Sequence, residues 1–170
     1  GTGVNIAQLV GHATLRAYAM EGMDRPTTDS ELSDMKDVLS TSLSEGAVGL
    51  SAGLTFPPSS NADSDELFSL CEIVKAHNGF FTMHIRSEGE HLIEAVSEVL
   101  EVARKTNVRI NLSHHKALGK GNWGKVERTL GMIDEARTRG IEVTLDIYPY
   151  NAGSGGLTQL LPLWVFETGR

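Results

Sequence analysis

The stretch Arg109-Ile-Asn-Leu-Ser-His-His-Lys-Ala-Leu-Gly-Lys-Gly-Asn-Trp-Gly124 decides the fold of this chain. It begins as a short apolar strand, and two histidines and a lysine stand where that strand should end. A loop with three glycines follows. Because α/β folds place their chemistry at the carboxyl ends of buried parallel strands, the stretch predicts a functional edge of a sheet.

Two other stretches have the same character, Phe80-Phe-Thr-Met-His84-Ile-Arg86 upstream and Val143-Thr-Leu-Asp146-Ile-Tyr148-Pro-Tyr150 downstream. Together with the small-residue strand expected at 47–53, their centres are about 30 residues apart, which is one strand–helix unit. A first strand is expected over 4–12.

The intervals between these strands carry helix signals. Thr28-x-x-Glu31 and Asp63-x-x-Glu66 have capping-box spacing and start two of the helices. Two more are expected from about residues 90 and 124. Residues 14–25 show no clear pattern, and Arg25-Pro26 argues against a helix through that point.

Regular alternation of strands and helices predicts an α/β fold with a parallel sheet and right-handed crossovers. A doubly wound sheet and a (β/α)₈ TIM-type barrel both satisfy it. No Gly-x-Gly-x-x-Gly or Walker loop follows a strand, so the nucleotide-binding sheet loses its main support. Ligand-type residues at successive strand ends favour a partial barrel, since a full one needs about 250 residues.

Composition excludes several classes of function. A formal charge of −7 argues against binding to nucleic acid, and no apolar run of about 18 residues could span a membrane. The single cysteine, Cys71, fits a reducing compartment, so we expect a cytoplasmic protein. The first residues are neither a signal peptide nor a natural start, and we expect 1–170 to form a single domain.

His84 and His114 are the best candidates for metal ligands. Each lies near the end of a predicted strand, and the two strands are one unit apart, so adjacent parallel strands would bring the imidazoles together. Two hydrogen-bonded histidines of the core would give the same pattern. We interpret Cys71 as a core residue, because it lies on the apolar face of a predicted helix.

Three further residues lie near these strand ends. Lys116 follows His114 by two positions and could bind a substrate carboxylate, although a solvated loop lysine is the simpler interpretation. Asp146 could support a metal-bound histidine or cap a turn. Tyr148 could contact the substrate or serve in packing.

Taken together, five motifs resemble the N-acyl-D-amino-acid deacylases (D-aminoacylases) of the metal-dependent amidohydrolase superfamily. They occur in the family's order and cover nearly all of the chain. The motifs are Leu9-Val-Gly-His-Ala-Thr-Leu-Arg16, Gly46-Ala-Val-Gly-Leu-Ser-Ala-Gly-Leu54, His84-Ile-Arg-Ser-Glu-Gly-Glu-His91, Ser113-His-His-Lys116 with Asn122-Trp-Gly124, and Leu145-Asp-Ile-Tyr-Pro-Tyr150.

The resemblance implies that the chain corresponds to about strands three to seven of the family's barrel. It implies that His84 and His114 bind metal and that Lys116 and Tyr148 bind the substrate carboxylate. The implied reaction is zinc-dependent hydrolysis of an N-acyl-D-amino acid, with one or two zinc ions and an aspartate that moves the proton.

The chain departs from the family pattern in ways that affect activity. The family's His-x-His motif and cysteine ligand would precede residue 1, and its catalytic aspartate would follow residue 170. Cys71 does not match that cysteine, and Ser87 and Phe56 replace residues tied to substrate preference. We therefore expect no catalytic residue within this stretch, weak zinc binding, and no turnover by the chain alone.

Open sheet edges and an apolar segment predict self-association, and we expect a homodimer or a swap of elements between two copies. The apolar residues are Leu157, Leu160, Leu161, Leu163, Trp164 and Phe166. Two rival interpretations remain. A hydantoinase or dihydroorotase type would act on cyclic amides but usually needs a carbamylated lysine, for which the sequence has no candidate. A scaffold domain would keep the barrel motifs without the chemistry.

Overall fold

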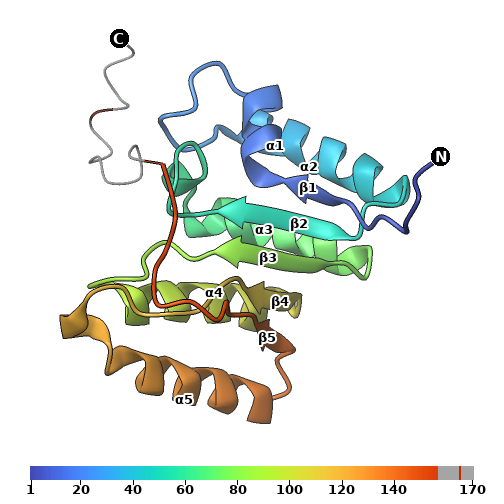
Figure 1. Cartoon of the computed structure of the whole chain (residues 1–170). Helices are drawn as coiled ribbons and strands as arrows, with labels where there is room; N and C mark the ends of the chain where they lie inside the picture. The colour runs from blue at the N-terminus through green and yellow to red at the C-terminus, as the bar shows by residue number, and fades with distance from the viewer. Residues whose placement is uncertain (157–164, 166–170) are drawn as a thin grey trace.

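The structure is a computed structural model that describes residues 1–156 and residue 165. Five strands alternate with helices along the chain (Figure 1). The elements are β1 (Leu9–Gly11), α1 (His12–Ala19), α2 (Asp29–Ser44), β2 (Gly49–Gly53), η1 (Ser59–Asn61), α3 (Ser64–Ala76), β3 (Phe80–His84), α4 (Leu92–Thr106), β4 (Arg109–Leu112), η2 (Lys120–Asn122), α5 (Lys125–Thr138) and β5 (Val143–Leu145). The apolar segment from Leu157 to Phe166 that we expected to promote association lies outside the described residues, except for position 165.

The strands form one parallel sheet in the sequential order β1-β2-β3-β4-β5. A doubly wound sheet reverses its order part-way, whereas successive units of a barrel add strands in chain order. The prediction of a partial barrel is therefore confirmed. In Figure 1, α3 and α4 lie side by side behind the strands, as the outer helices of a barrel do.

The hydrophobic core lies between the sheet and the helices. Alternate strand residues point to it, and the buried strand side chains are Leu50, Ala52, Phe81, Met83, Ile110, Leu112 and Val143. Helices α2, α3 and α4 supply the facing layer, with Leu39, Leu70 and Val99 each fully buried. Burial of this kind stabilises the fold by about 25 cal/mol for each Å² of apolar surface removed from water.

The predicted helix starts are confirmed. Thr28 caps α2 in a complete capping box with Glu31, and Gly46 takes a positive φ of 114° just after the helix ends. Asp63 caps α3 by accepting a hydrogen bond from the backbone N–H of Glu66. The side chain of Glu66 does not complete a capping box with Asp63, because it is bonded to His12 and Arg16 instead.

The N-terminal prediction was wrong in its extent. The first strand covers only Leu9–Gly11, and Val4 and Ile6 are exposed. Residues His12–Ala19 form α1, which includes His12 from the expected strand and part of the segment 14–25 that showed no clear pattern. The helix forms because its buried face includes charged residues that find partners, a feature that apolar periodicity does not detect.

A buried ionic cluster, made of His12, Arg16, Ser59 and Glu66, joins α1 to α3. All four side chains are at most 1% exposed. His12 Nδ1 lies 2.8 Å from Ser59 Oγ and its Nε2 lies 2.8 Å from Glu66 Oε1. Arg16 donates to both oxygens of Glu66 at 2.7 and 2.6 Å. The cluster fixes α1 on the fold, and His12 has a structural role in it.

Burial alone would raise the pKa of Glu66, but the bonds from His12 and Arg16 outweigh it and the pKa lies below its ordinary value. A carboxylate with a lowered pKa stabilises the folded state above its unfolded pKa. That stabilisation is lost as the pH falls through the folded pKa.

Among the described residues, none of the helices combines the length and the apolar character that crossing a membrane requires.

Replacing Glu66 with glutamine should lower the free energy of unfolding by about 3 kcal/mol, because Arg16 would keep a buried charge without its partner. Urea unfolding at neutral pH measures the change. Glu72→Gln, on the exposed side of the same helix, is the matched control and should change little. The gap between wild type and Glu66→Gln should narrow in acid; equal stability of the two variants at neutral pH would contradict the role of the cluster.

Candidate functional site

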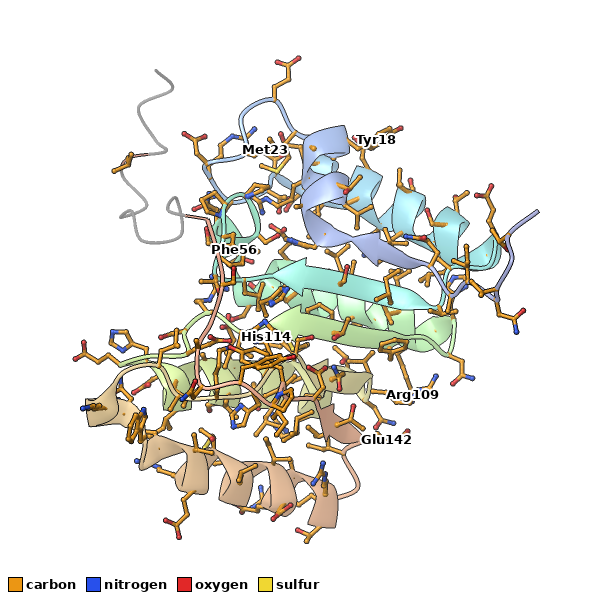
Figure 2. All side chains as sticks on the ribbon, in the orientation of Figure 1. Tyr18, Met23, Phe56, Arg109, His114 and Glu142 are labelled. Atoms are coloured by element: carbon orange, nitrogen blue, oxygen red, sulfur yellow. The ribbon has the colours of Figure 1, made fainter. Side chains whose placement is uncertain are left out.

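The polar residues expected to carry chemistry gather at the carboxyl ends of β3, β4 and β5. Figure 2 shows His114 and Phe56 toward the end of the sheet to which the strand arrows point, with Arg109 and Glu142 at the opposite end. Barrel enzymes place their active sites at this carboxyl-terminal end of the sheet.

His84 and His114 lie next to each other, as the sequence predicted. The Nδ1 atom of His84 faces the Nε2 atom of His114 within hydrogen-bonding distance. Their ring centroids are 4.4 Å apart, with the ring planes tilted by 31°. Residues 30 positions apart meet in this way because β3 and β4 are in parallel register up to the pair Met83↔Leu112, just before the two histidines.

The backbone of His114 has a left-handed conformation, with φ at 42°. In β4, Ile110 and Leu112 point to the core, so Asn111 and Ser113 point to the opposite face. Strict alternation would turn residue 114 back toward the helices. The positive φ interrupts the alternation and lets its ring meet that of His84, at the cost of a backbone region that non-glycine residues seldom adopt.

Asp146 supports this left-handed turn. Its Oδ1 accepts a hydrogen bond of 2.6 Å from the backbone N–H of His114, and its Oδ2 accepts one of 2.8 Å from the amide of Asn111. Partial burial opposes ionisation of Asp146, but these two bonds outweigh it and lower the pKa of the carboxyl group. Asp146 therefore holds the backbone of His114 and does not contact its ring in any described bond.

A row of polar side chains lies behind the histidines on the same face of the sheet. The register pairs Ser51 with Thr82, Thr82 with Asn111, and Asn111 with Thr144. The amide of Asn111 donates to Thr82 at 3.2 Å, and Thr144 donates to Asn111 at 2.8 Å. This polar row links three strands to Asp146 and so to His114.

Lys116 and Glu88 form the polar side of the site. Lys116 Nζ lies 2.7 Å from Glu88 Oε1 and 2.9 Å from His114 Nδ1. The ring of Tyr148 lies close by, with its centroid 5.2 Å from Lys116 Nζ and 6.3 Å from the ring of His114. The sequence allowed Lys116 to be either a solvated loop lysine or a residue that binds a substrate carboxylate. In the structure, Lys116 lies beside His114.

The surroundings of His84 favour its neutral form. Burial lowers the pKa of His84, and the neighbouring His114 and Lys116 lower it further. The edge of the Phe56 ring lies against it, with centroids 6.1 Å apart. A neutral imidazole keeps a lone pair, which is what a metal ligand requires.

The donor set fits part of a metal centre. Two imidazole nitrogens face each other, and zinc is bound by histidine nitrogens of this kind. Within residues 1–156 and at 165, no group of three or more histidine, cysteine, aspartate or glutamate side chains is arranged to hold a metal ion. The described residues therefore offer two ligands, and Cys71, buried in the core, is not one of them.

Sequence reasoning missed Glu88 and Asn111. Glu88 lies only four residues after His84, and a charged residue so close to a strand end was the available signal. Asn111 lies inside the strand, and its position opposite Thr82 was visible only once the register was known. Of the other histidines, His115 is buried with its Nε2 at 2.9 Å from Thr129 Oγ1, and His77 and His91 are exposed.

Known proteins carry the same arrangement of elements. The chain is 40% identical over 156 residues to D-aminoacylase and 43% identical over 159 residues to N-acyl-D-glutamate deacylase, both from Alcaligenes xylosoxydans xylosoxydans. This chain is a homologue of the D-aminoacylases. The matches cover 92% and 94% of the chain, and no family model matches it.

The homology with D-aminoacylases extends to solved structures. A crystal structure of N-acyl-D-glutamate deacylase from Bordetella bronchiseptica, with zinc and a phosphonate inhibitor that mimics the tetrahedral intermediate, matches 86% of the chain with a TM-score of 0.85 and 43% identity. The chain spans about a third of its relatives' length, 32% of both D-aminoacylase and N-acyl-D-glutamate deacylase.

Replacing Asp146 with alanine should loosen the turn at His114, because its backbone N–H loses a charged acceptor. A hydrogen bond to a charged group contributes about 1.5–3 kcal/mol, so amide exchange at residue 114 should accelerate about tenfold or more. Hydrogen exchange followed by NMR measures it. Asp134→Ala, on the exposed side of α5, is the control. An unchanged amide exchange rate at residue 114 in Asp146→Ala would show that Asp146 does not support the turn.

Proposed function

We propose that this chain is part of a metal-dependent hydrolase that cleaves the amide bond of N-acyl-D-amino acids to a carboxylate and a free D-amino acid. One observation carries the proposal: His84 and His114 converge with Lys116 beside them, at the carboxyl ends of the strands in a chain homologous to D-aminoacylases. A row of chemistry-bearing residues at that edge is typical of an active site and not of a scaffold.

His84 and His114 are proposed to hold zinc, through Nδ1 and Nε2 respectively. These are the two nitrogens that face each other, and a zinc-bound crystal structure of a relative supports the choice of metal. Bound zinc would polarise the amide carbonyl and lower the pKa of its water. We propose one or two zinc ions in the whole protein, as the resemblance implies.

Lys116 and Tyr148 are proposed to bind the carboxylate of the substrate. The ammonium group of Lys116 lies beside His114, so a carboxylate paired with it would hold the neighbouring amide near the histidines. Its partner Glu88 keeps this ammonium in place before substrate arrives. The ring of Tyr148 flanks the same position. We assign no acid–base residue to the described part of the chain.

Four further proposals concern the chain as a whole. We propose that 1–170 is a single domain from the middle of a barrel, in a cytoplasmic protein. On its own it should bind zinc more weakly than micromolar, which calorimetry can measure, because two ligands are fewer than zinc sites use.

The strands β1 and β5 each pair on one side only among the described residues, so we propose a homodimer through these edges, testable by light scattering.

The whole protein should release D-amino acids from their N-acetyl derivatives and leave the L-enantiomers intact. His84→Ala and His114→Ala should each reduce bound zinc and lower kcat/KM by about 100-fold or more. Amine release and metal analysis measure the two effects. His91→Ala, an exposed histidine of the same segment, is the control. Full activity of both ligand variants, or no activity of wild type on any N-acyl-D-amino acid, would reject the proposal.

Lys116→Met should raise KM for N-acyl-D-amino acids about tenfold or more, since a charge-assisted hydrogen bond to the substrate carboxylate is lost. Lys120→Met, four residues further along in the exposed loop, should leave KM unchanged. Steady-state kinetics with the N-acyl amino acid and with its carboxamide separate the contributions. Lys116→Met should not affect the carboxamide, and an equal loss on both substrates would argue against carboxylate binding.

A further inference from the structure

Glu88 contacts the candidate site, and neither the sequence motifs nor the proposed reaction gives it a role toward the metal. Its Oε1 lies 2.7 Å from both His114 Nδ1 and Lys116 Nζ, and its side chain is 12% exposed. We propose that Glu88 is a positioning residue that holds His114 in the tautomer a metal ligand needs. This inference rests on the proposed function, because it concerns the same metal site.

The backbone fixes the carboxylate where it is. The carbonyl oxygen of Glu88 accepts a hydrogen bond of 2.7 Å from the N–H of Leu118, which joins the segment after β3 to the segment after β4. Lys125 Nζ strengthens this junction by donating at 2.6 Å to the carbonyl oxygen of Glu90. The carboxylate of Glu88 therefore reaches His114 from a docked loop and not from a free surface chain.

The two neighbours of His114 Nδ1 favour opposite tautomers. A neutral imidazole has one N–H. If Nε2 is to give its lone pair to a metal, the proton must be on Nδ1, and the carboxylate oxygen Glu88 Oε1 lies 2.7 Å from that nitrogen. Lys116 Nζ, at 2.9 Å, can only donate, so it favours the form with the proton on Nε2, which cannot bind a cation.

Glu88 resolves this competition in favour of the metal-binding form. Its Oε1 also accepts from Lys116, and the carbonyl oxygen of His114 lies 3.1 Å from Lys116 Nζ. The ammonium group thus has two acceptors without using Nδ1. A carboxylate that accepts the second N–H of a ligating histidine orients its ring and strengthens its lone pair, and loss of such a partner typically lowers metal affinity about 10–100-fold.

The test is a zinc chloride titration of the 170-residue chain in wild type, Glu88→Leu, Glu88→Gln and Glu90→Leu. Shifts of the His84 and His114 imidazole ¹⁵N resonances give the dissociation constant and report which nitrogen of His114 carries the proton. Glu90 lies in the same loop with its side chain exposed, which makes Glu90→Leu the matched control. Amide spectra of each variant report the fold.

Glu88→Leu should weaken zinc binding about tenfold or more and move the proton of His114 from Nδ1 to Nε2. Glu88→Gln keeps a neutral acceptor, so its zinc affinity should lie between those of Glu88→Leu and wild type. The zinc affinity of Glu90→Leu should match that of wild type. The double variant Glu88→Leu with Lys116→Met should recover part of the affinity, because the donor that favours the wrong tautomer is gone.

Equal affinities for wild type and Glu88→Leu, or a proton that stays on Nδ1 in Glu88→Leu, would overturn the role of Glu88 and leave the metal site intact. If Glu88→Leu fails to fold, an affinity of Glu88→Gln identical to wild type overturns it instead. If zinc shifts the imidazole ¹⁵N resonances of neither His84 nor His114 in wild type, the proposed metal site itself is wrong. The inference about Glu88 is then wrong as well.

Discussion

The parallel register between β3 and β4 is the constraint on which the rest of the structure depends. It pairs Phe81 with Ile110 in the core and Thr82 with Asn111 on the opposite face, and it ends just before the two histidines. A shift by one residue would exchange the faces of one strand, burying an amide and exposing an apolar side chain. The apolar pattern therefore fixes the register, and the register brings residues 84 and 114 together.

The two faces of the sheet have different tasks. One is apolar and packs against the helices, while the other carries the polar row from Ser51 to Thr144. Asn111 is central to this row, since its amide group bonds Thr82, Thr144 and Asp146. Satisfied polar groups of this kind order a site because each has a defined partner, whereas apolar contacts are not directional.

Most of the fold could be predicted from the sequence because its signals are local. The capping residues Thr28 and Asp63 act within one turn of helix, and strand–helix alternation gave the sheet. Helix α1 was missed because it depends on Glu66, which is 50 residues from Arg16 and supplies the charge that lets this arginine be buried. No pattern within residues 12–19 reports a partner at that distance.

The candidate site was predictable in part for the same reason. Strand ends are local features, so the sequence could place His84 and His114 next to each other. Glu88 was not, because its relevance depends on two loops that dock through Leu118. Two adjacent histidines also look alike in a sequence, yet His114 faces the site and His115 packs on Thr129. What separates them is a single backbone rotation.

That rotation at His114 also limits how the protein could be redesigned. A residue placed there must accept a positive φ, which asparagine and aspartate tolerate and β-branched side chains do not. Aspartate, an oxygen donor, is therefore the exchange most compatible with the chain path. A change in the metal preference proposed for this end of the sheet would be sought more readily through a carboxylate at position 114 than through any bulkier group.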